Sequence, residues 1–130
     1  MAARGGERGQ AAVELMLVLP FVALLALLLL QVGLVVRDQL LVAHAAREAA
    51  RQAAVDADAT VPRAAAVAAT RLRPDRLEVE VHPLGGDASR RPGGRIRATV
   101  RYRSPTDVPL VGALIGDLEL VGRAAMRVEG

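Results

Sequence analysis

The sequence contains no cysteine and no lysine, and each absence narrows what the protein can do. Without cysteine there are neither disulfide bonds nor thiolate metal sites, and the redox compartment cannot be inferred. All 17 basic residues are arginine, and the formal net charge at pH 7 is only +3. Because the arginines alternate with acidic residues and form no basic block, the sequence does not predict nucleic-acid binding.

Large aromatic side chains are nearly absent as well. The chain has one Phe, one Tyr and no Trp, and its apolar content comes mainly from Ala, Val and Leu. Much of that content lies near the N-terminus, so residues 37–130 offer only a thin core. We therefore expect a marginal fold that depends on a partner or on a membrane.

Residues that carry catalysis or bind metals are scarce. The two histidines, His44 and His82, have no second His and no Cys at ligand spacing. Ser89 and Ser104 have no neighbouring His or Lys to activate them. No Gly-rich phosphate loop follows a predicted strand. The sequence thus predicts that the protein is not an enzyme, with no catalytic residues, no cofactor and no metal site.

The strongest positive feature is a long apolar run. Residues Leu15 to Val36 carry no formal charge. As a helix this run is about 33 Å long, enough to cross a hydrocarbon core of roughly 30 Å. The run therefore predicts a transmembrane helix.

Two common kinds of N-terminal apolar segment, a secretory signal peptide and a plain signal anchor, could explain the run. A secretory signal peptide fits poorly, because the run exceeds the usual apolar region and the Ala-x-Ala triplet at 43–45 lies well past its end. A plain signal anchor explains the run but not Glu14, since a carboxylate at the mouth of a membrane helix usually has a partner.

The start of the run carries a more specific pattern. Residues 8–15 read Arg-Gly-Gln-Ala-Ala-Val-Glu-Leu, and residues 17–20 read Leu-Val-Leu-Pro. This segment resembles the start of TadE-like pseudopilins, the minor pilin-like proteins of tight-adherence (Flp) pilus systems. In type IV prepilins generally, a membrane peptidase cuts after a Gly, and the fifth residue of the mature chain is typically Glu. By this resemblance, cleavage after Gly9 makes Gln10 the first mature residue and Glu14 the fifth.

The resemblance implies a role in assembly. The carboxylate of Glu14 would meet the new α-amino group of a neighbouring subunit, which neutralises two charges that are costly at membrane depth. Pro20 lacks an N–H and would kink the helix, either to aid packing or without consequence. The implied partners are the membrane, a prepilin peptidase, other pilin-like subunits and pilus assembly proteins. Gln10, where major pilins prefer Phe, and the missing C-terminal disulfide favour a minor component.

The resemblance also implies an orientation in the cytoplasmic membrane. A prepilin-like protein is single-pass, with its N-terminus inside and its C-terminal domain outside the cytoplasm. The charge distribution does not support this orientation independently. Arg4 and Arg8 precede the run, whereas Arg37, Arg47 and Arg51 follow it within about 15 residues.

Beyond the membrane, residues 37–59 are predicted to extend the helix, because no Gly or Pro occurs from Leu34 to Val61. A stripe of small residues along this extension faces either other subunits or the protein's own sheet, and Ala-rich composition alone explains it equally well. A break at residues 56–60 is followed by a short second helix capped by Thr60 and ended by Pro74. The stripe consists of Val42, Ala46, Ala49 and Ala53, and the second helix is predicted to bury Val61, Ala65, Ala68 and Leu72.

Three segments then alternate apolar and polar residues, which predicts half-buried strands at 77–82, 95–103 and 118–128. The loop from Leu84 to Gly94 would make a hairpin of the first two. The first strand is acidic and the second is rich in Arg, so opposite charges favour placing the second strand in the middle. A basic stripe that binds an acidic partner remains an alternative. The apolar patch at 110–115 could cover the core, touch the outer leaflet or dock a partner.

The complete prediction is an α+β, pilin-like architecture: a transmembrane helix extended into a long helix, a short second helix, and a three-stranded antiparallel sheet. We divide the chain into a leader (1–9), a transmembrane helix (10–36), a helical extension (37–59) and an extracytoplasmic α+β domain (60–130). The predicted function is that of a TadE-like minor pilin in pilus or secretion-apparatus assembly. The alternative is an unprocessed single-pass protein whose outer domain binds a ligand or partner.

Overall fold

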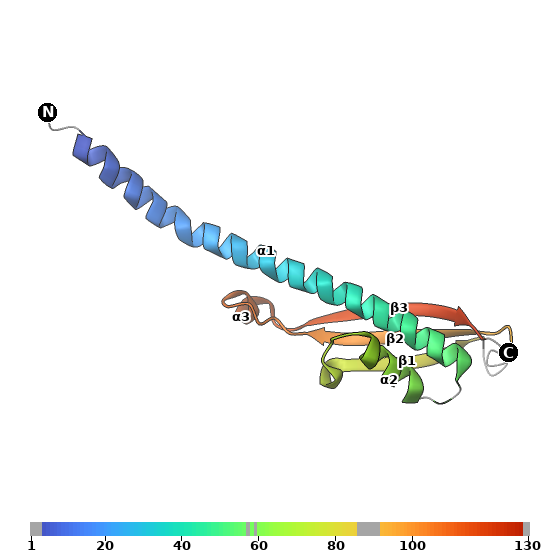
Figure 1. Cartoon of the computed structure of the whole chain (residues 1–130). Helices are drawn as coiled ribbons and strands as arrows, with labels where there is room; N and C mark the ends of the chain where they lie inside the picture. Colours follow the sequence, from blue (N-terminus) through green and yellow to red (C-terminus); the bar gives the residue numbers. More distant parts are fainter. Residues whose placement is uncertain (1–3, 57, 59, 86–91, 129–130) are drawn as a thin grey trace.

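The computed structural model describes residues 4–56, 58, 60–85 and 92–128. A long helix, α1 (Arg4–Val55), projects far beyond a small domain that packs along its C-terminal part (Figure 1). That domain contains α2 (Thr60–Ala69), the 3-10 helix η1 (Pro74–Arg76), three strands and the short helix α3 (Val111–Ile115). The predicted α+β class and the order of its elements are confirmed.

Helix α1 joins the predicted membrane helix and its extension into one element of 52 residues. It continues without interruption through Pro20. At 1.5 Å per residue it is about 78 Å long, more than twice the thickness of a hydrocarbon core. The helix therefore has length to cross a bilayer and still provide a platform outside it.

The connection between α1 and α2 is held by two aspartates. The side chain of Asp56 accepts a hydrogen bond from the amide of Asp58 at 2.9 Å. The side chain of Asp58 in turn accepts bonds from the amide and the hydroxyl of Thr60, at 2.9 and 2.8 Å. The predicted capping role of Thr60 is wrong: Asp58 accepts the first amide of α2, because it precedes the helix and its side chain faces the unpaired N–H.

The buried face of α2 differs in part from the prediction: Leu72 is buried as predicted, but it lies after the end of the helix. Pro62 and Ala66, one turn apart, are buried against the rest of the molecule, whereas Ala68 is exposed. In a helix made mostly of Ala and Val, hydrophobicity varies too little to define a face, so contact with α1 sets the rotation. Pro74 does not end α2 directly but opens η1.

The sheet consists of β1 (Leu77–Leu84), β2 (Arg95–Ser104) and β3 (Leu118–Arg127), antiparallel in the order β1-β2-β3. The Arg-rich strand is therefore central, as predicted. On β2 the inward residues Ile96, Ala98, Val100 and Tyr102 are all buried. On β3 burial fades toward the end, where Met126 is exposed. Part of the predicted hairpin loop between β1 and β2 lies outside the described residues.

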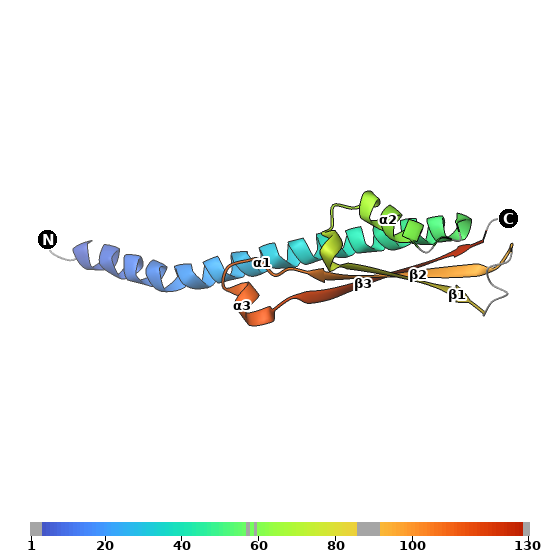
Figure 2. The same cartoon turned by 90° about the horizontal axis from the view of Figure 1, so that it is seen from below.

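The sheet packs its apolar face against α1, and α2 covers α1 from another side (Figure 2). The stripe of small residues on α1 faces this domain, which answers the question that the sequence left open. Its members Val42, Ala46 and Ala49 are fully buried, and Ala45 and Ala50 widen the stripe. A Cβ added at Gly122 on β3 would lie 2.7 Å from the carbonyl oxygen of Val42. Small side chains therefore let helix and sheet approach closely.

Charges on the open face of the sheet support its register only in part. Glu78 lies opposite Arg101, and Arg103 lies opposite Glu119. The ion pair between Glu80 and Arg101 spans 3.6 Å, with both side chains almost half exposed, so its contribution is small. At the far end Arg95 lies opposite Arg127, a repulsive pair. The buried apolar face is therefore the stronger determinant of register.

Candidate assembly segment of the N-terminal helix

The predicted processing and assembly residues share one face of α1. Gly9, Gln10, Val13, Glu14 and Leu17 line a shallow, open groove along the helix. Gln10 and Glu14 lie one turn apart, separated by about 6 Å along the axis. Removal of the residues before Gln10 would place a new α-amino group one turn from the Glu14 carboxylate.

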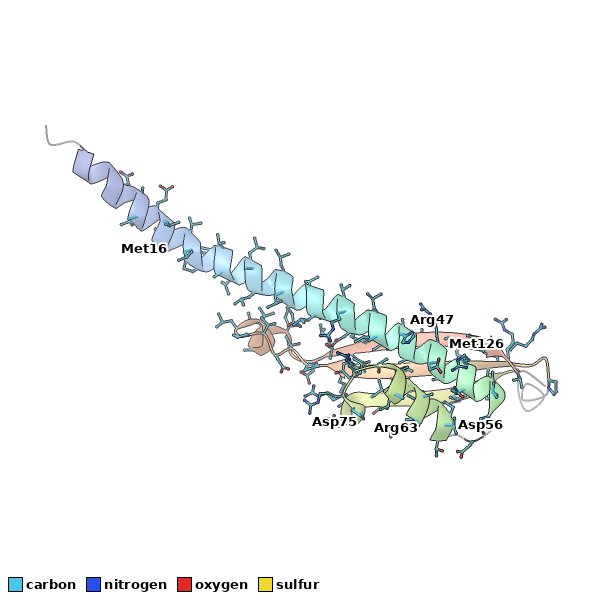
Figure 3. The ribbon with its side chains drawn as sticks, viewed as in Figure 1. Met16, Arg47, Asp56, Arg63, Asp75 and Met126 are labelled. Atoms are coloured by element: carbon cyan, nitrogen blue, oxygen red, sulfur yellow. The ribbon has the colours of Figure 1, made fainter. Side chains whose placement is uncertain are left out.

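Glu14 is exposed and has no ion pair or hydrogen bond among the described residues. Its neighbours Val13, Leu15, Met16 and Leu17 are large, apolar and exposed. Figure 3 shows the side chain of Met16 projecting freely from this part of the helix. A carboxylate in such surroundings is tolerated in water but becomes costly at membrane depth unless a cation meets it.

Gly9 is not required by packing. A Cβ built at this position meets no heavy atom of the described chain within 4 Å. Glycine inside a helix is less favourable than alanine by roughly 1 kcal/mol. The fold thus gives no reason for glycine here, and the described part of the leader, from Arg4 to Gly9, is itself helical.

The apolar part of α1 fits a membrane span. It is the one stretch in the described chain that is long and apolar enough to cross a bilayer, with a mean hydropathy of 2.8 in its best window. None of that window is buried inside the molecule. A core helix of a soluble protein would bury such a surface, so this helix is suited to single-pass membrane anchoring. Pro20 leaves the helix unbroken, and its effect on packing stays a prediction.

Two contacts that the sequence did not predict fix the sheet to the end of the apolar run. The hydroxyl of Ser104 donates to the carboxylate of Asp38 at 2.7 Å. One residue further along, the side-chain amide of Gln39 donates to the carbonyl of Val121 at 3.2 Å. These residues are far apart in sequence, and no spacing rule pairs them. They hold β2 and β3 at the point where α1 loses its uninterrupted apolar character.

The described domain shows little that resembles a reactive centre. Within it, no three His, Cys, Asp or Glu side chains are grouped to hold a metal ion. His44 and His82 are both exposed. A hollow of about 270 Å³ lies on the sheet's open face around the Arg76–Asp117 ion pair of 2.9 Å. Acidic and basic side chains line it together: Asp75, Arg76, Glu78, Arg101, Arg103, Asp117 and Glu119.

Comparison with known families finds a similarity in the N-terminal segment. Residues 9–51 match the family of TadE-like proteins. This match confirms the predicted resemblance, and it begins at Gly9 and includes Gln10, Glu14 and Pro20. The match covers 43 of the 130 residues, so it shows a similarity of the N-terminal part of the chain. No curated protein and no solved structure matches the chain.

The TadE-like match covers the apolar run and most of the helix that supports the sheet. It ends at Arg51, before α2 and the three strands. The match therefore coincides with the part of the molecule that carries the candidate site. The sheet domain is known from the structure alone.

Proposed function

We propose that this TadE-like protein is a minor pilin, or pseudopilin, that takes part in assembly of a Flp-type pilus or a related secretion apparatus. It is inserted with its N-terminus inside, and a prepilin peptidase removes residues 1–9. The mature chain then packs laterally with other pilin-like subunits and pilus assembly proteins through α1. Its sheet domain makes contacts outside the membrane.

The observation that carries this proposal is the placement of Glu14. The carboxylate lies exposed among apolar side chains, five residues after a glycine that packing does not require. Insertion of a transmembrane helix costs about 2.5–3.5 kcal/mol for a charged side chain at the centre of the helix, and less for one near its ends. A neighbour's α-amino group at Gln10 would relieve that penalty, whereas an isolated anchor gains nothing from the carboxylate.

The first test is the intact mass and N-terminal sequence of the protein recovered from its native membrane. We expect a chain that begins at Gln10 and remains membrane-bound. A chain that retains Met1 or Ala2 would rule out processing and favour a plain anchor. A chain that begins after Ala45 would instead identify the apolar run as a cleaved secretory signal.

A second test separates assembly from anchoring. Glu14→Ala should keep the protein in the membrane but prevent its incorporation into the pilus or secretion assembly, measured by cross-linking to neighbouring subunits. Met16→Ala, two residues away and also exposed, is the matched control and should assemble normally. Normal assembly of Glu14→Ala would exclude the charge-pairing mechanism.

The charged hollow favours one alternative function. It could receive a polar ligand or a partner's side chains, as expected for an unprocessed single-pass protein with a binding domain outside the membrane. Under that function, Glu14→Ala leaves activity intact and Arg103→Ala abolishes binding. The two proposals therefore predict opposite sensitivities in the same pair of variants.

A further inference from the structure

The loop between β2 and β3 presents apolar side chains outward. Within residues 108–116, which include α3, Val108 and Val111 are buried and hold the loop in place. Leu110, Leu114 and Ile115 project from it, with 64%, 85% and 46% of their surface exposed. Leu114 is the most exposed large apolar side chain of the described domain. We call residues 108–116 the apolar loop.

The backbone of the apolar loop is held in an unusual conformation. Leu110 has φ 68° and ψ −42°, and the Val111 amide donates to the Pro109 carbonyl at 2.8 Å. This is a γ-turn with a positive φ, which is rare and strained for a residue with a side chain. Glycine would adopt it without strain, yet Leu stands there and faces outward.

Other contacts stabilise the same shape. The Thr106 hydroxyl donates to the Gly116 carbonyl and closes the base of the loop. Gly112 lies against the Thr106 backbone, where an added Cβ would be only 2.1 Å from the carbonyl oxygen. These contacts give the apolar loop a defined conformation.

The position of the apolar loop relates it to the membrane span. Figures 1 and 2 both place α3 beside α1, beyond the end of the sheet that is nearest the apolar run, and the two helices are in contact. Asp38 contacts that end of the sheet, and on the same face of α1 Gln31 is only 3% exposed although its neighbours are exposed. Gln31 lies five residues before Val36, or about 7–8 Å inside the end of the run.

The distribution of charged residues along the apolar loop points to the same location, beside the membrane span. No charged residue occurs from Val108 to Gly116, and Asp107 and Asp117 stand at its two ends. Asp117 is paired with Arg76 at 2.9 Å. An uncharged apolar tip suits the acyl chains of a bilayer, and charged ends suit the headgroups. Interfacial elements are typically buried about 5–10 Å deep at this boundary.

We propose that the apolar loop inserts into the outer leaflet of the bilayer that α1 spans, with Leu110, Leu114 and Ile115 among the lipids. The loop then forms a second contact with the membrane, beside the helix, and fixes the tilt of the sheet domain relative to the bilayer. Three side chains are too few for a stable protein interface, which buries about 800 Å² per partner. The inference rests on the proposed membrane insertion of α1.

The test uses tryptophan as a reporter, because the chain contains none. The full-length protein carries Leu114→Trp, Phe21→Trp in the middle of the span, or Val55→Trp at the far end of α1. All three positions are exposed. Each variant is reconstituted in phosphatidylcholine vesicles with acyl chains brominated near the headgroup or near the bilayer centre. Iodide serves as the aqueous quencher.

We expect Leu114→Trp to be quenched several-fold more by shallow than by deep bromine, and only weakly by iodide. Phe21→Trp should respond to deep bromine, and Val55→Trp to iodide alone. If Leu114→Trp behaves like Val55→Trp while Phe21→Trp is quenched by lipid, the loop does not insert. Protection from both lipid and iodide would mean that protein covers the loop, which also overturns the proposal. If Phe21→Trp escapes the brominated lipids, the membrane span itself is wrong.

A second reporter guards against local distortion. Ile115→Trp lies at the end of α3 and, like Leu114, is exposed. It should show the same preference for shallow bromine. Disagreement between the two reporters, with Ile115→Trp open to iodide and insensitive to bromine, would count against insertion of the loop.

Discussion

At the level of single residues, two glycines differ in whether the structure leaves room for a side chain. Gly122 lies where β3 touches the backbone of α1, and an added Cβ would approach the Val42 carbonyl oxygen to 2.7 Å. Gly9 has open space where a Cβ would be, within the described chain. Packing therefore explains the first glycine but not the second, and for the second we propose recognition by a peptidase.

Gly9→Ala should block processing without affecting the fold. The added methyl group meets no heavy atom of the described residues within 4 Å, and alanine favours the helix by roughly 1 kcal/mol. We expect the mass of the variant from native membranes to include residues 1–9. Gly33→Ala, on the same helix and equally unhindered, is the control and should be cleaved normally. Cleavage of both variants to Gln10 would show that the peptidase does not require this glycine.

Gly122→Ala should destabilise the domain, because the contacted atom is backbone and cannot move aside alone. Overpacking of this kind typically lowers the free energy of unfolding by about 1–3 kcal/mol. Denaturant titration of the full chain in detergent, followed by circular dichroism, measures it. Gly33→Ala again serves as the control and should be no less stable than the unmodified protein, because alanine favours the helix and meets no atom within 4 Å. Equal stability of the two variants would mean that α1 and β3 are less tightly packed than the structure shows.

At the scale of elements, α1 changes its function along its length. Its first part carries large exposed apolar side chains, and its last part carries small buried ones. Large side chains suit contact with lipid, and small ones let the sheet and α2 approach the helix axis. The change occurs near Asp38 and Gln39, whose side chains bond to β2 and β3. One continuous helix thus joins the apolar part to the domain.

The turn between α1 and α2 should make stability depend on pH. Hydrogen bonds from the Thr60 amide and hydroxyl lower the pKa of Asp58 below its ordinary value of 3.8. A depressed pKa in the folded state means that this stabilisation is present above the unfolded pKa and is lost as pH falls through the folded pKa. Thermal unfolding temperature should therefore fall between about pH 5 and about pH 3.

Asp58→Asn tests that origin. Its amide oxygen can still accept the Thr60 N–H, but it does not titrate. We expect a weaker fall in unfolding temperature over the same pH range, with the helix content of the variant unchanged. Because the pKa of Glu48 is also lowered, chiefly by its hydrogen bond with Arg51, some pH dependence should persist. An identical pH profile for both proteins would show that Asp58 does not contribute.

At the scale of the whole molecule, the protein is an anchor with a laterally attached domain. The sheet does not sit at the tip of the helix but lies along it (Figure 1). Its charged face points away from α1, and its apolar loop approaches the membrane span. In an assembly, α1 would make contacts in the membrane while the charged face remains open to partners outside.

The side of the membrane on which the domain lies can be measured directly, since the chain has no cysteine. His82→Cys introduces one thiol at an exposed position of β1. In intact cells or protoplasts, we expect a membrane-impermeant maleimide to label it completely. In sealed inverted vesicles the same variant should resist labelling until detergent is added. The reverse pattern would place the sheet in the cytoplasm and exclude the proposed orientation.

Features that depend on local periodicity could be predicted from the order of the residues. The apolar run, its Gly- and Pro-free extension and the three alternating strands follow from spacings of a few residues, and so does the central place of the Arg-rich strand. The Gly9–Glu14 spacing belongs to the same class, and the TadE-like match covers it. These features could be predicted from the sequence without knowledge of any long-range contact.

Features that depend on contacts between residues far apart in the chain became visible only in the folded molecule. An alanine stripe shows no preference between a partner and the protein's own sheet until the sheet is placed against it. For the same reason, the sequence could not predict that α2 turns Pro62 and Ala66 toward the interior. The Asp38–Ser104 hydrogen bond and the approach of α3 to the span join segments separated by more than sixty residues. Periodicity reports which face of an element is apolar, but the packing of the whole chain selects what covers that face.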